Sequence, residues 1–125
     1  MSTMPMILLV GIAGALGALA RYGVAEWTAR RWTGRFPMAT FAINVSGAFA
    51  LGLLLTAGGK HALPWPRGVA GTGFLGGYTT FSTLSYETHY LARHGHRWHA
   101  WLNGLATLLA GAIAAAAGIL LGRIL

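Results

Sequence analysis

Three long stretches of the chain are almost wholly apolar, and short polar connections separate them. The first runs from Pro5 to Trp27, the second from Pro37 to Thr56 and the last from Trp98 to Leu121. A helix that spans a membrane needs about 20 predominantly apolar residues. The pattern therefore predicts three ordinary spanning helices, and the segment between the second and the last needs a separate explanation.

That central segment, Gly71 to Glu87, reads GTGFLGGYTTFSTLSYE and is too polar and too rich in glycine for an ordinary spanning helix. Gly76-Gly77 predicts a helix break, with a second half-helix beginning near Thr79. Hydrocarbon cannot hydrogen-bond hydroxyl groups or a broken backbone, so such a segment must be buried by protein or border a polar cavity. We interpret it as a permeation or binding site in which the positive end of the half-helix favours an anion. Hydroxyls recur on one of its faces at helical spacing, with Phe81 near the edge: Thr79, Ser82, Thr83 and Tyr86.

Composition supports a membrane protein, because 55% of the 125 residues are hydrophobic and only 9% are charged, against about 25% charged in soluble domains. The length holds about four spanning helices, so residues 1–125 are predicted to form one domain. The chain contains 19 glycines. Small residues let helices approach closely in lipid, which favours tight packing, including packing across a dimer interface. Two seams stand out: Gly11, Gly14 and Gly17, and later Gly111, Ala115, Gly118 and Gly122.

A few polar side chains interrupt the apolar spans. Arg21 lies about two turns inside the first span, where it either extends to the interface or lines an aqueous vestibule that attracts anions. Asn44 stands alone in the second span, and its carboxamide must bond another helix or serve a ligand. Asn103 and Thr107 lie one turn apart in the last span.

The formal net charge of +7 resides in the connections and ends. The basic residues are split between the two sides, so the positive-inside bias is small and orientation is weakly specified. Only Glu26 and Glu87 are acidic, which makes a wet interior suitable for anions. The five arginines of one side are Arg30, Arg31, Arg35, Arg93 and Arg97, and the other side has Lys60, Arg67 and Arg123.

Several other chemistries are unsupported. Gly71, Gly73 and Gly76 match the spacing of a dinucleotide fingerprint, but no strand precedes them and no acid follows at the required distance. The histidines between the last two helical segments, His89, His94, His96 and His99, fit no zinc spacing. We also find no set of nucleophile, base and orienting acid, and we expect neither an enzyme nor a nucleic-acid partner.

Three ordered motifs resemble those of the CrcB/Fluc fluoride channel family, and the resemblance extends along the whole chain. They are GALGALARY at residues 14–22, NVSG at 44–47 with Phe49 and Gly52, and GGYTTFSTLSYE at 76–87. The resemblance implies four helices per subunit, the third broken mid-membrane, in an antiparallel dual-topology homodimer among the lipids of the cell inner membrane. It implies passive fluoride export through two pores per dimer.

The resemblance also implies roles for particular residues. A structural sodium ion at the dimer centre would be held by the backbone carbonyls of Gly76 and Thr79. Asn44 and Phe81 would lie along the fluoride path and Glu87 near a pore mouth, and Asn103 and Thr107 fall at polar fourth-helix positions of the family, which puts Thr107 on the path. The residues themselves indicate Arg21 for the vestibule and Thr79, Thr80, Ser82 and Thr83 as hydroxyl donors to the ion.

Leu84 departs from the family pattern, which usually has a second phenylalanine at this position. A phenyl ring has a partly positive edge that can face an anion, and leucine has none. Either Phe81 with Asn44 and the hydroxyls suffices, or the chain works with a sister subunit in a heterodimeric channel. Alternatively, Phe81 has no role in conduction and only packs against neighbouring residues.

Two other classes of protein compete with this interpretation. A small multidrug-type transporter has a similar size, but it needs a membrane-embedded acid in its first helix, and Pro5 to Ala20 contains none. A non-conducting scaffold subunit would explain the glycine seams but not the clustered hydroxyls.

Overall fold

The computed structural model describes residues 2–61 and 63–125, and within these residues the regular structure is entirely helical. Its three long helices are α1 (Thr3–Ala29), α2 (Met38–Thr56) and α6 (Arg97–Arg123). Each is long and apolar enough to cross a membrane. The three predicted spans are therefore confirmed, with ends displaced by no more than two residues.

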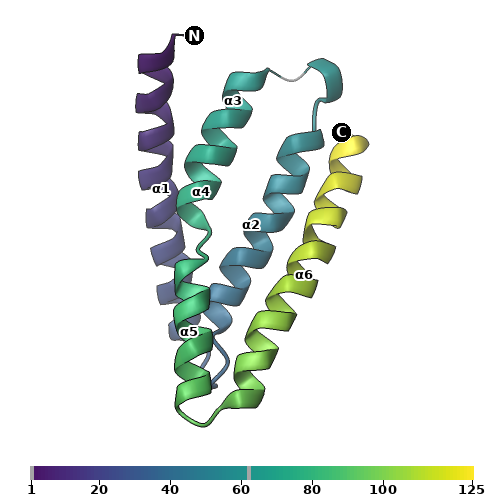
Figure 1. Ribbon diagram of the computed structural model, residues 1–125. Helices are drawn as coiled ribbons and strands as arrows, with labels where there is room; N and C mark the ends of the chain where they lie inside the picture. The colour runs from purple at the N-terminus through teal and green to yellow at the C-terminus, as the bar shows by residue number, and fades with distance from the viewer. Residues whose placement is uncertain (1, 62) are drawn as a thin grey trace.

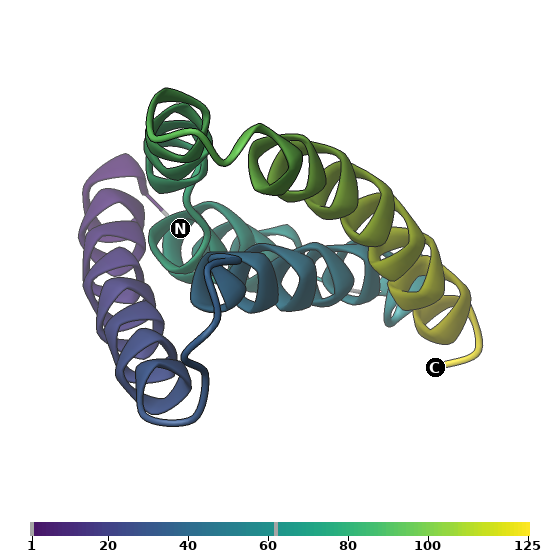
Figure 2. The ribbon, with the colours of Figure 1, turned by 90° about the horizontal axis from the view of Figure 1, so that it is seen from below.

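The chain passes four times along the long axis of the molecule, alternately down and up in Figure 1, so both termini lie at the same end. Seen from below, α1 and α6 lie on opposite sides of α2 and the third pass (Figure 2). Two connections form the lower end of Figure 1, one between α1 and α2 and one between the third pass and α6. The four helical passes that the sequence predicts are present.

The third pass consists of several pieces. After the short helix η1 (Gly59–His61) come α3 (Pro64–Gly68), η2 (Val69–Leu75), α4 (Gly76–Tyr78) and α5 (Ser82–Arg93). The wide π-helical turn η2 was not foreseen from the sequence; such turns recur at functional sites. Thr79 adopts an extended backbone with φ −80° and ψ 158°, so the helix is interrupted between Tyr78 and Ser82.

The predicted position of the break was wrong, because Gly76 and Gly77 are helical and the interruption follows them. Nor does Gly77 adopt a positive φ; among the described residues only Gly58, Gly59 and Gly95 do, and all three lie in connections. Close packing explains Gly77 instead. A Cβ atom there would overlap the carbonyl of Gly14 on α1.

Two glycine seams hold the passes together. On one side Gly17 of α1 faces the backbone of Phe74, and Gly73 of η2 faces Val10. On the other side Gly118 of α6 faces the backbone of Phe49, and Gly52 of α2 faces Ala115. A methyl group at any of these positions would collide with backbone. Helix approach in lipid depends on such small residues, so the seams set the spacing of α1 from the third pass and of α2 from α6.

Few apolar side chains are buried within the single chain: Ile43, Leu91 and Ala100. Many large ones are exposed along the passes, including Leu8, Leu19, Leu108, Ile113 and Leu120. Apolar surface of this extent marks contact with membrane or protein. With the three apolar spans, it defines a multi-pass membrane protein.

Candidate functional site

The side chain of Asn44 holds the interruption in the third pass. Its Nδ2 donates to the carbonyl oxygen of Thr80 at 2.8 Å, and its Oδ1 accepts from the backbone N–H of Thr80 at 2.9 Å. In an uninterrupted helix these two groups would bond along the chain. Asn44 therefore replaces the hydrogen bonds that Thr80 would make within a continuous helix. Of the two roles considered for Asn44, this is the bond to another helix. It stabilises the interruption in the middle of the third pass.

Thr80 also organises the start of α5. Its Oγ1 accepts a hydrogen bond from the backbone N–H of Thr83 at 3.2 Å, as a helix cap does. The same oxygen lies 3.1 Å from Thr83 Oγ1 and 3.4 Å from Ser82 Oγ. Three hydroxyl groups are thus gathered within one turn, at the point where the helix resumes.

These hydroxyls line a cavity of about 440 Å³ between α1, α2 and α5. Arg21 reaches the same cavity from α1, and Thr40 reaches it from α2. A guanidinium and several hydroxyls are all hydrogen-bond donors, so this cavity, hereafter the hydroxyl cavity, can solvate a small anion. Its full lining is Ala18, Arg21, Tyr22, Ala25, Ala39, Thr40, Ile43, Thr80, Ser82 and Thr83.

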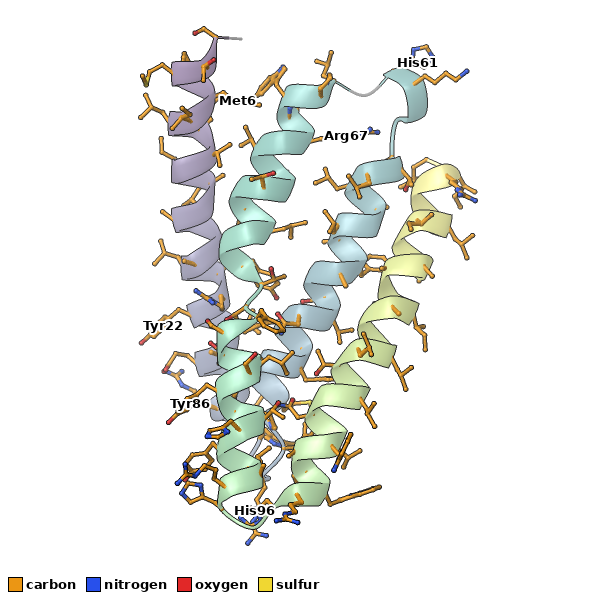
Figure 3. The ribbon with its side chains drawn as sticks, viewed as in Figure 1. Met6, Tyr22, His61, Arg67, Tyr86 and His96 are labelled. Carbon is orange, nitrogen blue, oxygen red and sulfur yellow. The ribbon has the colours of Figure 1, made fainter. Side chains whose placement is uncertain are left out.

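Thr40 was missed in the sequence, although it precedes Asn44 by one helical turn and so shares its face of α2. Thr40 is only 5% exposed, and its hydroxyl donates a short hydrogen bond to Oε1 of Glu87. Glu87 lines a second, open cavity of about 380 Å³ between α5, the α1–α2 connection and the adjoining ends of α1 and α2, with Arg35 and Tyr86 also in its wall. Because Thr40 lines the hydroxyl cavity and Glu87 lines the second one, their hydrogen bond joins the two cavities. Tyr86, in the wall of the second cavity, lies in the lower half of Figure 3.

Phe81 and Leu84 lie elsewhere. Both line a groove of about 670 Å³ between α5 and α6, and neither is among the residues of the hydroxyl cavity. The Phe81 ring is 80% exposed. A large ring this exposed within one chain must meet lipid or another subunit.

The last helix contributes two buried polar side chains. Asn103 is fully buried, and its Nδ2 donates to Thr88 Oγ1 at 2.9 Å. Its Oδ1 and the buried hydroxyl of Thr107 have no hydrogen-bond partner among the described residues. Thr107 is not part of the hydroxyl cavity, so the structure does not bring it together with Thr80, Ser82 and Thr83.

Gly76 and Thr79, the residues implied for sodium, line a shallow groove of about 280 Å³ together with Asn44 and Gly47. The carbonyl of Gly76 has lost its helical donor, because the N–H of Thr80 bonds Asn44 instead. Backbone carbonyls suit hard cations. The arrangement fits such an ion, although one chain supplies only part of a coordination shell. In the described part of the chain, no three His, Cys, Asp or Glu side chains converge as a metal site.

The fold and these cavities define the class: a small multi-pass membrane protein with a donor-lined cavity beside an interrupted helix. Comparison with known proteins makes the class specific. The family profile described as "CrcB-like protein, Camphor Resistance (CrcB)" matches residues 8–119. The chain belongs to this CrcB family, which confirms the resemblance seen in its motifs.

Individual relatives match along nearly their whole length. The chain is 47% identical to the "Fluoride-specific ion channel FluC" of Acidobacterium capsulatum over 93% of this chain and 94% of that protein. It is 45% identical to "Fluoride-specific ion channel FluC 1" of Listeria innocua over 92% of this chain and 95% of that one. The protein of the same name from Leifsonia xyli is 44% identical over 94% and 86%. These names are those of ion channels and not of enzymes.

Proposed function

We propose that this protein is a fluoride-selective channel that lets fluoride leave the cell passively. The observation that carries the proposal is the hydroxyl cavity, which Arg21, Thr80, Ser82 and Thr83 line in an otherwise apolar bundle. Thr40 also lines it, with its hydroxyl proton donated to Glu87. The names of the relatives support fluoride as the ion. Fluoride is small and strongly hydrated, so a path for it must offer compact donors in place of water.

The two cavities suggest the route of the ion. Fluoride enters the cavity near Glu87 from the lower end, where arginines raise the local anion concentration. It then passes the Thr40–Glu87 pair and reaches the hydroxyl cavity, where Arg21 stabilises its charge. A membrane potential of 100 mV contributes about 2.3 kcal/mol per charge to anion exit, so flow needs no coupling to protons or nucleotides.

The third pass is, in this proposal, a spanning helix broken mid-membrane. The 12 residues of α5 are too few to cross alone, since a span needs about 20. The helical run from α3 to α4 is also short of that length. The two pieces cross together, and the polar interruption between them is tolerated because Asn44 satisfies its backbone groups.

The working unit is an antiparallel, dual-topology homodimer with two pores in the cell inner membrane. The exposed Phe81 ring and the wide apolar surface of the single chain support a partner subunit. In the dimer, Phe81 of one chain reaches a path completed by the other. Thr107, whose buried hydroxyl lacks a partner among the described residues, becomes a further donor to the ion as the path extends along α6.

A sodium ion at the dimer centre would be held by the carbonyls of Gly76 and Thr79 from both subunits. The lost helical bond of Gly76 supports this assignment. When bound, the ion supplies a fixed positive charge between two chains that are already basic. Asn44 keeps the Gly76 carbonyl available for this ion, because it hydrogen-bonds the N–H of Thr80 that would otherwise donate to Gly76.

A heterodimeric fluoride channel is the second candidate, and Leu84 is the observation that favours it. Leu84 lines the same groove as Phe81 but has no aromatic ring whose edge could face the anion. A sister subunit with phenylalanine at this position could supply that ring. A small multidrug-type exchanger is disfavoured, since α1 contains no acid before Glu26 near its end.

The decisive experiment is ion efflux from liposomes that contain only this chain. With a potassium ionophore to balance charge, we expect fluoride to leave down its gradient and chloride to stay trapped. Equal efflux of both ions would contradict selectivity. No efflux from the single chain, with efflux restored by a co-expressed sister subunit, would favour the heterodimer.

A further inference from the structure

One end of the molecule concentrates basic side chains. The connection between α1 and α2 and the connection between α5 and α6 meet at the lower end in Figure 1. The whole chain has only two acids, Glu26 and Glu87, and both lie towards this end. Five arginines outnumber these two acids, so this end keeps a net positive charge. The basic end, as we name it, comprises Arg30, Arg31, Arg35, Arg93 and Arg97 with His89, His94, His96 and His99.

The two connections touch at Arg35 and His96. Nη1 of Arg35 lies 3.4 Å from Nδ1 of His96, although 61 positions separate them in sequence. The ring of His99 stands edge-on to that of His96, with centroids 6.1 Å apart. The pKa of His96 is lowered, first by partial desolvation and then by the nearby charges of Arg35, His99 and His94. The neutral ring accepts from the guanidinium, which has five N–H donors and can still present a fork to an anion.

Tryptophans place the basic end at the membrane surface. Trp27 closes α1, Trp32 follows in the connection, and Trp98 and Trp101 stand in the first turns of α6, all of them exposed. Exposed tryptophans settle at the level of lipid headgroups. His96 lies at the lower end of Figure 3, and Arg35 contacts it. The tryptophans therefore favour a position of this pair near the lipid phosphates.

The opposite end is different. Arg67 there donates to the carbonyl oxygen of Ala57 at 2.7 Å and also reaches that of Gly59, so it closes the end of α2. Lys60 and Arg123 are the other Lys and Arg side chains at that end, and both are exposed. These two residues therefore make a matched control for the arginines of the basic end.

We infer that the basic end binds the phosphate groups of anionic phospholipids, with Arg35 at the centre of the contact and Arg97, which follows His96 in the chain, as a second contributor. Charge complementarity identifies the ligand, since basic clusters beside spanning helices attract anionic headgroups. The bidentate geometry of arginine suits phosphate oxygens. This inference rests on the membrane location of the chain and is independent of which ion the chain conducts.

The test uses the full chain in nanodiscs of phosphatidylcholine with or without phosphatidylglycerol. Native mass spectrometry counts the phosphatidylglycerol retained per chain, and thermal unfolding reports the stabilisation that it brings. Because one arginine near an anionic surface contributes about 1 kcal/mol, we expect about a fivefold loss of retention for Arg35→Gln, and a larger loss for Arg35→Gln with Arg97→Gln. Lys60→Gln with Arg123→Gln should retain the lipid like the wild type.

Three outcomes would overturn the inference. Equal losses in the two double variants would mean that net charge and not this end attracts the lipid. Equal stabilisation by inorganic phosphate in pure phosphatidylcholine would assign the site to a free anion. Arg35→Lys keeps the charge and serves as a control for the possibility that the glutamine variants lose lipid because they misfold. If Arg35→Lys binds no more lipid than Arg35→Gln while remaining folded, the charge argument fails.

Discussion

Both the Nδ2 and the Oδ1 of Asn44 hydrogen-bond to the backbone of Thr80. Asn44→Asp keeps an acceptor for the N–H of Thr80 but sets a carboxylate against its carbonyl. An unpaired buried polar group costs about 1–3 kcal/mol, so the interruption should distort. We expect fluoride efflux to fall about tenfold or more, together with the melting temperature.

Ser46→Ala is the matched control for Asn44. Ser46 lies on the same helix, and its hydroxyl lies 2.9 Å from the Tyr78 hydroxyl at an exposed position. An exposed neutral hydrogen bond adds little to stability, so efflux should remain near that of the wild type. Wild-type efflux in Asn44→Asp would contradict the positioning role of Asn44.

Phe81 offers a separate test, because its ring is 80% exposed and contacts little of its own chain. Phe81→Ile should therefore leave folding and dimer formation intact. If the ring edge faces the ion, efflux in the same variant should fall severely. Leu84→Phe restores a second ring in the same groove and should leave flux unchanged or raise it. Normal conduction by Phe81→Ile would return Phe81 to a packing role.

At the scale of elements, the spacing between α1 and the third pass depends on glycine. Gly77→Val puts a side chain where a Cβ atom would already lie 3.0 Å from the Cα of Gly14 and overlap its carbonyl. Overpacking of this kind costs about 1–3 kcal/mol, and here backbone must move to relieve it. We expect a clear fall in melting temperature and weakened dimer formation on size-exclusion chromatography.

Gly23→Val on α1 is the control for this seam. A Cβ atom at Gly23 would meet nothing within 4 Å, so melting temperature and elution should stay close to those of the wild type. If Gly77→Val were equally silent, close approach of α1 to α4 would not determine the packing.

At the scale of the whole molecule, four passes place both termini on one side of the membrane (Figure 1). The excess of Lys and Arg at the basic end is modest, so orientation is weakly specified. A C-terminal tag should therefore be reachable from both sides of the cell membrane, measured by labelling intact and opened cells. One-sided labelling of the wild-type chain would contradict dual topology.

A charge-shifted variant sharpens this test. Thr33→Lys with His94→Lys adds two charges to the basic end at exposed positions. Labelling should then become one-sided, and efflux should fall because antiparallel partners become scarce. Two-sided labelling in this variant would show that lysine and arginine do not set the orientation.

The sequence by itself determined the class of protein and the position of its long helices. Hydropathy over a window is a local property, so α1, α2 and α6 could be placed within two residues. The hydroxyl-rich run from Thr79 to Ser85 and the motif at residues 14–22 also stand in the sequence without reference to any contact. These features sufficed for the family, which the profile match then confirmed.

Only the tertiary structure decided where the third pass opens and which side chains share a cavity. Gly76-Gly77 marked the break in the sequence, yet both residues are helical, and contact with α1 requires glycine at position 77. The opening falls instead where Asn44, 36 positions away, captures Thr80. The hydrogen bond between Thr40 and Glu87 could likewise be found only in the packed structure. Such pairings depend on how whole helices approach one another, and no local pattern of residues encodes that approach.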